Sequence, residues 1–240
     1  MDKDPGQILD DARQAFKEER YVESLENYKW FYDNAIEIDR SYYGVRLSYC
    51  LGEWAELGAR YPDALSELTN LKERTLSNFQ QSQRRQFFHE YSSICRVLKC
   101  EEETFHQFLQ VRETNKDFSH EIFTFVYEYC ASKKKWNLCR EYLGNGFEKY
   151  KRSLETFDHM MEFAAAKKGE LGGSIYKNGV AAFTREVLWI LDMLAYIDAP
   201  DEYSSAILKI ETDLKERGYG QLYSEIYEKS PHKQNIDKPE

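Results

Sequence analysis

Apolar residues recur at spacings of three and four along most of the chain, which is the periodicity of an amphipathic helix. In the stretch from Ile8 to Glu19, the apolar positions are Ile8, Leu9, Ala12, Ala15 and Phe16. The next stretch, from Tyr21 to Ile38, carries Tyr21, Leu25, Tyr28, Phe31 and Tyr32 on one side. No alternating apolar pattern is long enough to predict a strand. The pattern therefore predicts an all-α protein.

The stretch from Leu51 to Leu68 predicts a helix, a tight turn and a second helix. Tyr61-Pro62 marks the turn, because proline suits the first turn of a helix. Gly52 falls inside the first helix, where glycine costs about 1 kcal/mol relative to alanine. We therefore expect a neighbouring helix to approach closely at Gly52.

The same reading predicts further helices over 83–97, 101–112, 119–131, 136–152, 154–168, 180–197, 202–217 and 221–229. The predicted turns at Tyr21, Tyr61, Glu101 and Trp136 are 40, 40 and 35 residues apart. Such regular spacing is typical of stacked helical hairpins. Gly169 to Gly173 is predicted to be a loop, and residues 230–240 a disordered tail.

Two segments resemble the tetratricopeptide repeat. The pattern of that family is Trp-x2-Leu-Gly-x2-Tyr, then Ala-x3-Phe, then Pro. The second unit matches it at Ser48, Leu51, Gly52, Ala55, Ala64 and Leu68. The first unit matches it at Ile8, Asp11, Ala12, Ala15, Ser24 and Tyr28. The tryptophan and the closing proline are absent, and the resemblance is clearest over 7–75, weaker over 83–152 and divergent over 153–229.

The resemblance implies a single domain over 1–229, an α-α superhelix of antiparallel helix pairs with a C-terminal capping helix. In such arrays the first helix of each pair lines a groove that binds partners. Carried over by register, the groove positions are Arg13, Arg46, Tyr49, Glu53, His89, Glu90, Arg96 and Glu128. The resemblance thus implies a mixed-charge groove for a polar peptide or helix, and the alternative is that these residues form solvated helix faces.

One specialised form of the groove is not expected. Family members that bind a C-terminal carboxylate use Lys and Asn at positions held here by Leu9, Arg13, Arg46, Cys50 and Glu90. The carboxylate of Glu90 would repel such a ligand. We therefore predict no recognition of an acidic C-terminal peptide.

The chain carries a net charge of −9, which opposes general binding to nucleic acid. Residues 133–152 are locally basic, with Lys133, Lys134, Lys135, Arg140, Lys149, Lys151 and Arg152. Arg140 and Lys151 are predicted to share one helix face, which is either an anion contact or a solvated face. No apolar run reaches about 18 residues, so we expect no membrane span.

Five cysteines are present, and none forms a Cys-x-x-Cys pair: Cys50, Cys95, Cys100, Cys130 and Cys139. Without an apolar leader at the N-terminus, the pattern predicts reduced thiols and a cytoplasmic protein. The spacings among His89, Cys95, Cys100 and His106 are six, five and six residues, unlike the short ligand pairs of zinc sites. We therefore expect neither a metal nor another cofactor.

Three functions are compatible with these features. The first is a non-catalytic adaptor or scaffold that binds another protein in the concave groove. The second is a dedicated regulatory or inhibitory partner, of the immunity or antitoxin type, that acts through an acidic surface. The third is an α-helical enzyme with His159 or Glu170 near the 169–173 loop, which is not expected because no nucleophile is paired with a base. The partner and the oligomeric state stay open.

Overall fold

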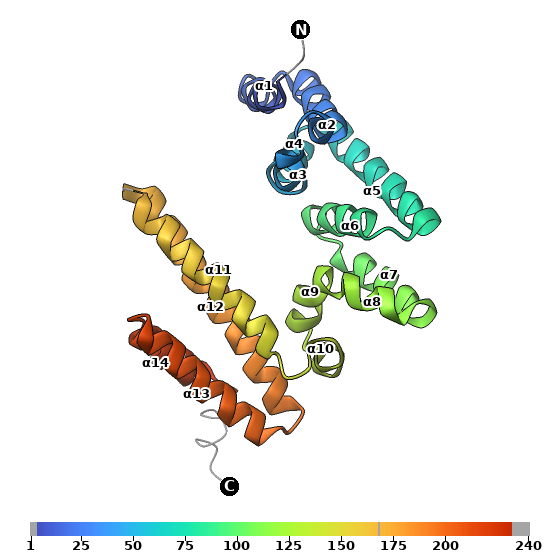
Figure 1. Cartoon of the computed structure of the whole chain (residues 1–240). Coiled ribbons are helices and arrows are strands. Elements are labelled where there is room, and N and C mark those ends of the chain that lie inside the picture. Colours follow the sequence, from blue (N-terminus) through green and yellow to red (C-terminus); the bar gives the residue numbers. More distant parts are fainter. Residues whose placement is uncertain (1–3, 168, 232–240) are drawn as a thin grey trace. The chain divides into compact units, whose positions relative to one another are not determined.

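The computed structural model describes residues 4–167 and 169–231, and within these ranges it contains helices and no strand (Figure 1). The all-α prediction is confirmed. The described residues form two compact units, which divide between Tyr129 and Cys130. No helix within the described ranges is both long enough and apolar enough to cross a membrane. The single domain expected over 1–229 stays a prediction.

The first unit is a run of helices joined by short turns. Its elements are α1 (Pro5–Lys17), α2 (Tyr21–Ile38), η1 (Arg40–Tyr42), α3 (Tyr43–Val45), η2 (Arg46–Cys50), α4 (Leu51–Arg60), α5 (Pro62–Ser82), α6 (Arg85–Val97), α7 (Glu101–Thr114), α8 (Lys116–Ile122), η3 (Phe123–Phe125) and α9 (Tyr127–Ser132), the last of which runs across the boundary. The segment η2 is a π-helix, whereas η1 and η3 are 3₁₀-helices.

Local chemistry explains several helix boundaries. The carboxylate of Asp4 accepts a hydrogen bond from the Gly6 N–H and caps α1. Pro62 opens α5, where its missing N–H costs nothing. The predicted turns at Tyr21, Tyr61 and Glu101 each fall at, or one residue before, the start of a helix. The turn at Trp136 likewise begins a helix in the second unit.

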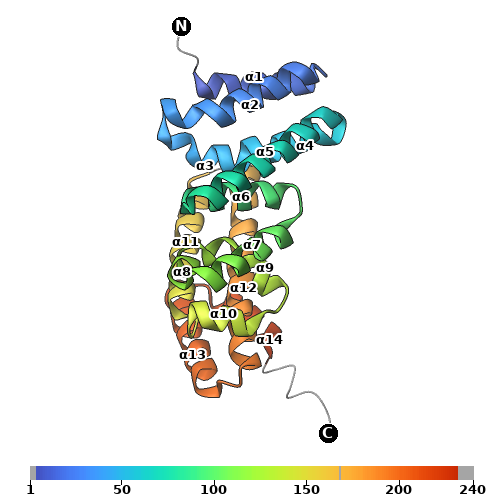
Figure 2. The ribbon, with the colours of Figure 1, turned by 90° about the vertical axis from the view of Figure 1, so that its right-hand side faces the viewer.

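Neighbouring helices of the first unit pack against one another in chain order, α1 on α2, α4 on α5, α5 on α6 and α6 on α7 (Figure 2). Alternate helices are also in contact, namely α2 with α4, α4 with α6 and α6 with α8. The core includes the fully buried side chains of Phe31, Leu51, Leu57, Leu68 and Ile94. Each helix therefore buries one stripe against the preceding helices and another against the following ones.

The prediction of a close approach at Gly52 is wrong. A Cβ built at Gly52 would have no atom within 4 Å, because this face of α4 is open. The close approach is six residues further along α4, at Gly58. At Gly58 a Cβ would lie 3.1 Å from Leu65 Cβ and 3.2 Å from Leu65 Cα. Gly58 therefore allows the start of α5 to fold back against the end of α4.

Two predicted helices are broken in the structure. The helix predicted over 119–131 is divided into α8, η3 and α9. The helix predicted over 136–152 ends at Leu143, because Gly144 (φ +59°) and Gly146 (φ +77°) turn the chain through left-handed backbone. Arg140 and Lys151 therefore lie on different helices and do not share a helix face.

The second unit contains α10 (Trp136–Leu143), α11 (Phe147–Ala166), α12 (Gly169–Tyr196), α13 (Pro200–Glu216) and α14 (Gly220–Lys229). The long helices α11 and α12 pack side by side, and α13 packs with α14 (Figure 1). Phe157 and Phe183 stack between α11 and α12 with ring centroids 4.7 Å apart. A Cβ at Gly179 would lie 2.6 Å from Met161 Cε, so this glycine admits the methionine side chain.

Two further predictions concern this unit. The prediction of a loop over 169–173 is wrong, since these residues form the beginning of helix α12. The predicted terminal helix over 221–229 is confirmed as α14. Ser230, assigned to the disordered tail, is fully buried and donates a hydrogen bond to the Tyr227 carbonyl. Pro231 is also described, whereas residues 232–240 of the predicted tail lie outside the described residues.

Candidate functional site

Two of the predicted groove residues, Arg13 on α1 and Glu53 on α4, form a forked ion pair. Arg13 Nε lies 3.1 Å from both carboxylate oxygens of Glu53, and Nη2 lies 2.9 Å from Oε1. The Tyr28 hydroxyl also donates to Glu53, at 3.4 Å. Hydrogen bonding to Glu53 raises the pKa of Arg13. The pair is partly exposed, so we expect it to contribute no more than about 1 kcal/mol.

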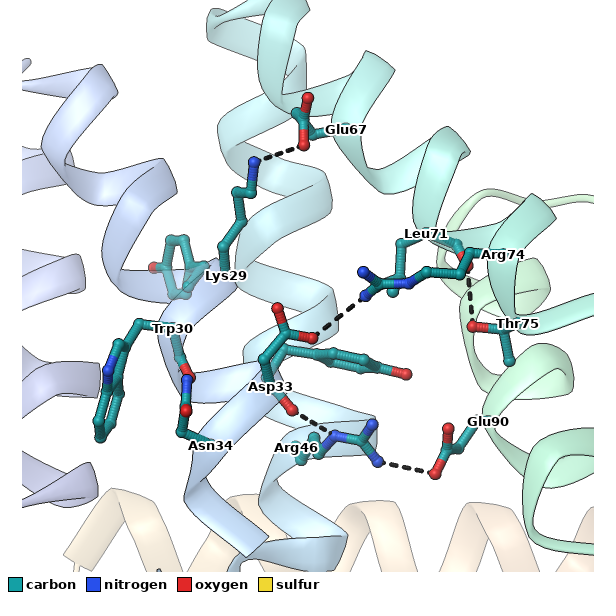
Figure 3. A network of polar contacts seen from close by, with 12 residues as sticks. Lys29, Trp30, Asp33, Asn34, Arg46, Glu67, Leu71, Arg74, Thr75 and Glu90 are labelled. Carbon is teal, nitrogen blue, oxygen red and sulfur yellow. Dashed lines mark hydrogen bonds and ion pairs between the residues drawn. The ribbon is translucent and has the colours of Figure 1, made fainter. Parts of the chain in front are cut away.

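A second pair of predicted residues is buried. Arg46 Nη1 lies 2.9 Å from Glu90 Oε1, and Arg46 Nε donates to the Tyr32 carbonyl at 2.6 Å (Figure 3). The guanidinium carbon of Arg46 also lies 3.9 Å from the centre of the Tyr32 ring. Burial by itself would lower the pKa of Arg46, but Tyr32 and Glu90 together raise it. The ion pair joins η2 to α6, and the hydrogen bond to Tyr32 joins η2 to α2. Both side chains are buried, so a partner could contact little of either.

Tyr49 is a predicted groove residue that faces solvent, with 65% of its surface exposed. It lies in η2, where the π-helical turn accommodates one extra residue ahead of α4. Such turns are rare and recur at functional sites. Gly52 follows Tyr49 by three residues and Glu53 follows it by four, so all three lie on one side of this helix. Tyr49 therefore stands beside an uncovered stretch of backbone and a forked ion pair.

The predicted residues of α6 lie along the edge of the same layer of helices. Arg96 is exposed, and its guanidinium reaches the Leu47 carbonyl of η2 at 3.5 Å. His89 stacks on Phe125, with ring centroids 4.4 Å apart, and its Nδ1 lies 3.1 Å from the Tyr43 hydroxyl. Burial, reinforced by Arg85 and Arg96, lowers the pKa of His89. His89 is thus a packed neutral ring.

Glu128, the last of the predicted groove residues, is exposed on α9. The structure thus places seven of the eight predicted residues on η2, α1, α4 and α6, with Glu128 on α9 as the eighth. Arg46 and Glu90 are buried beneath the others. The role of the eight residues as a binding groove stays a prediction. We name Arg13, Tyr49, Gly52, Glu53 and Arg96 the Tyr49 face.

Helices α2 and α5, the second helices of their hairpins, are joined by ion pairs that were not predicted from the sequence. Lys29 Nζ of α2 lies 2.5 Å from Glu67 of α5, and Arg74 of α5 lies 3.1 Å from Asp33 of α2 (Figure 3). A hollow of about 170 Å³ lies among these side chains, and Trp54 forms part of its lining. Both pairs join residues about 40 positions apart, a spacing that could have revealed them.

In the second unit, two cations of the basic segment are engaged in ion pairs. Arg140 of α10 makes two hydrogen bonds to the Glu202 carboxylate, at 2.6 and 2.8 Å. Lys149 of α11 lies 3.5 Å from Glu186 of α12. These contacts join helices within the unit and reduce the charge that the segment offers to an external anion. The anion contact proposed for 133–152 stays a prediction.

The second unit also has an open groove of about 350 Å³ between α11, α12 and α13. Its apolar lining includes Ile190, Ala206 and the partly exposed ring of Phe147. The Tyr150 hydroxyl donates to Asp213 at 2.9 Å near its floor. Apolar periodicity does not reveal this groove, because it predicts one helix over 136–152 where the structure has the turn that forms the end of the groove.

Comparison of the chain with protein-family models, with curated proteins and with solved structures gave no match.

Proposed function

We propose that the chain is a tetratricopeptide-like helical repeat protein that serves as a non-catalytic adaptor, binding a peptide or helix of another protein across the Tyr49 face. The repeat character is supported by contacts that recur at similar sequence separations. Arg13 pairs with Glu53 at a separation of 40 residues, Asp33 with Arg74 at 41, and Arg46 with Glu90 at 44. Each unit of such an array leans on the next through corresponding positions.

The observation that carries the binding proposal is the exposure of Tyr49 among side chains that are already held in place. Exposed tyrosines with a fixed surrounding are frequent anchors of protein interfaces, because they bury a large area and lose little side-chain freedom. Arg13 pairs with both Glu53 and Asp10, so its charge is balanced within the chain. A partner therefore needs to bring no carboxylate to Arg13.

Gly52 and Arg96 define what else a partner would meet. With no side chain at Gly52, an incoming backbone can approach the helix closely beside the Tyr49 ring. Arg96 offers exposed guanidinium donors to a carbonyl or a carboxylate at the edge of the face. The chemistry fits a segment with one apolar side chain over Tyr49 and a polar or acidic group near Arg96.

The experiment begins with affinity capture by the full chain from its native cell and identification of the captured protein by mass spectrometry. Binding of that purified protein is then measured against Tyr49→Ala and Arg96→Ala. We expect Tyr49→Ala to weaken binding about 30-fold, the equivalent of about 2 kcal/mol for an interface anchor. Tyr196→Ala is the matched control, because Tyr196 is 61% exposed and belongs to the second unit.

Unchanged affinity in Tyr49→Ala would contradict this assignment. The regulatory or inhibitory alternative, which is based on the net charge of −9, is separated from it by salt. Binding through an acidic surface loses association rate steeply as ionic strength rises. Binding centred on Tyr49 should instead keep most of its association rate between low and physiological salt.

A further inference from the structure

A left-handed turn at the end of α6 brings two cysteines together. The Cys100 N–H donates to the Cys95 carbonyl at 2.8 Å, and the Lys99 N–H donates to the Arg96 carbonyl at 3.2 Å. With Lys99 at φ +58°, these are the two hydrogen bonds of a Schellman motif. In this motif the residue after the turn contacts the residue five positions earlier. Cys100 accordingly lies against Cys95.

A carboxylate completes the cluster. Glu103, on the first turn of α7, places a carboxylate oxygen so that it and the two sulfur atoms all lie within 4.8 Å of one another. Cys95 is buried, whereas Cys100 and Glu103 are partly accessible to solvent. Lys72 of α5 lies 2.6 Å from Glu103, which fixes the carboxylate beside the thiols. A small ion can therefore reach the cluster from its open side.

Thr104 lies against the cluster and supports a thiolate there. Its hydroxyl is buried beside the Cys95 thiol, and a thiol sulfur is only a weak hydrogen-bond acceptor. A thiolate at Cys95 would accept a stronger hydrogen bond from this hydroxyl than the thiol does. Hydrogen bonds of this kind commonly orient and stabilise the ligands of a metal.

We propose that Cys95, Cys100 and Glu103 bind one thiophilic divalent cation of the Zn²⁺ class. The two thiol protons leave to solvent as the cation binds, so the ligands carry three negative charges. The cation and Lys72 together carry three positive charges, and the site is neutral overall. In a tetrahedral zinc site with Zn–S bonds of about 2.3 Å, the ligand atoms are about 3.8 Å apart. The ligand atoms of the cluster lie within 4.8 Å of one another, so side-chain rotations must close a gap of up to about 1 Å as the cation binds.

The fourth coordination position is left to water or to a group of another molecule. The histidines considered in the sequence analysis do not belong to the cluster. His89 is packed against Phe125 and Tyr43, and His106 lies beside Phe105. The ligand that the sequence spacing concealed is Glu103, which is near the thiols because α7 begins immediately after the turn.

The test uses the full chain, reduced and freed of metal with a chelator. Cd²⁺ is added first, and the ultraviolet charge-transfer band of cadmium thiolate is followed to its end point, which we expect at one equivalent. The affinity for Zn²⁺ is then measured by competition with a chromogenic chelator. We expect Cys100→Ser to abolish the band and Glu103→Gln to weaken Zn²⁺ binding at least tenfold. Thr104→Val should weaken it about tenfold, as removal of a supporting hydrogen bond does.

Cys130→Ala is the matched control, because Cys130 is a buried helical cysteine outside the cluster, and its binding should equal that of the unaltered chain. Circular dichroism confirms that each variant is folded. The side chain of Glu103 is half-exposed, so Glu103→Gln is informative even if a cysteine variant unfolds. Absence of the cadmium-thiolate band in the unaltered chain would overturn the proposal. So would a Zn²⁺ affinity of Cys100→Ser and Glu103→Gln equal to that of the unaltered chain. Loss of two thiols to a mild oxidant, without metal binding by the reduced chain, would assign a disulfide instead and overturn it as well.

Discussion

The rings of Tyr21 and Tyr61 stack with centroids 6.2 Å apart and an interplanar angle of 25°, although 40 residues separate them. Both tyrosines stand where one helix ends and the next begins, at the start of α2 and just ahead of α5. Corresponding turns of successive hairpins therefore touch. This contact gives a physical meaning to the 40-residue spacing, because the turns can stack only when the intervening helices have matching lengths.

The first prediction concerns the buried ion pair of Arg46 and Glu90. Replacing Glu90 with Gln removes the charge that balances the buried Arg46. We expect the free energy of unfolding to fall by about 3 kcal/mol. Urea denaturation followed by circular dichroism measures this change. The matched control is Asp33→Asn, which breaks an exposed pair between α2 and α5 and should cost less than about 1 kcal/mol.

Replacing both partners of that pair gives a stricter test. The double variant Arg46→Met with Glu90→Leu removes two buried charges and leaves neither uncompensated. We expect it to be substantially more stable than Glu90→Gln alone. A double variant as unstable as the single one would mean that losing the hydrogen bond from Arg46 to the Tyr32 carbonyl costs as much as removing the unpaired charge gains.

The second prediction compares two glycines of α4. Gly52→Ala should stabilise the chain by about 1 kcal/mol, because the added methyl group meets open space and alanine favours the helix. Gly58→Ala should destabilise it, since the methyl group would press on the Leu65 backbone at 3.2 Å. Thermal unfolding of both variants measures the difference. Equal changes in melting temperature would contradict the assignment of the close contact to Gly58.

The third prediction concerns pH. Burial beside Arg85 and Arg96 lowers the pKa of His89, so the unfolded chain binds this proton more tightly than the folded chain does. The neutral His89 ring makes its full contribution to the free energy of unfolding above about pH 6.5, the approximate pKa of histidine in the unfolded chain. That contribution is lost as the pH falls from about 6.5 through the lower pKa of the folded chain. Urea denaturation at pH 7.5, 6.5 and 5.5 should show this loss.

The control for the pH prediction is His89→Phe, which keeps an aromatic ring against Phe125 and cannot take up a proton. This variant should lose less stability between pH 6.5 and 5.5 than the unaltered chain loses. An identical pH dependence in both would mean that other groups, such as the carboxylates of surface pairs, account for it. The hydrogen bond to the Tyr43 hydroxyl is lost at every pH and does not affect the comparison.

The fourth prediction concerns the contact between Trp54 and α5. The indole N–H donates to the Ala64 carbonyl at 2.9 Å in a buried setting. Trp54→Phe removes this hydrogen bond and leaves a small void, and we expect a loss of about 1 to 3 kcal/mol. Equilibrium unfolding in urea measures it. Trp30→Phe, on the adjacent helix α2, is the comparison, because the side chain of Trp30 is not among the buried core residues.

The helical elements were predictable from sequence because apolar periodicity is a local property. Helix α2 begins and ends at the predicted residues, Tyr21 and Ile38. The break between α10 and α11 was missed because apolar Leu143 and Phe147 continue the helical spacing across it. A Gly-Asn-Gly sequence over 144–146 was present, and it was the local signal for a turn.

The candidate site was less accessible from sequence. A register taken from a family pattern assumes an unbroken α-helix, and the π-helical segment from Arg46 to Cys50 departs from that assumption. Arg46 was therefore assigned to an open groove, whereas the structure buries it with Glu90. The residue types of this segment do not predict a π-helical turn. The sequence predicts a break between the helices ending at 97 and beginning at 101, but it does not reveal the left-handed conformation of Lys99 on which the metal proposal depends.

The π-helical turn has a consequence for how the chain tolerates changes in length. One residue more than a regular helix needs is absorbed there, so the buried stripes before and after it keep their partners. Deleting Ser48 would convert the segment to a regular α-helix and leave the flanking stripes in register, whereas one further residue that the turn cannot absorb would rotate everything ahead of it by about 100° relative to α4. That insertion would move Tyr43 away from His89 and separate the contacts between two neighbouring hairpins. The length of this segment is thus a structural parameter in its own right, as selective as the identity of any side chain within it.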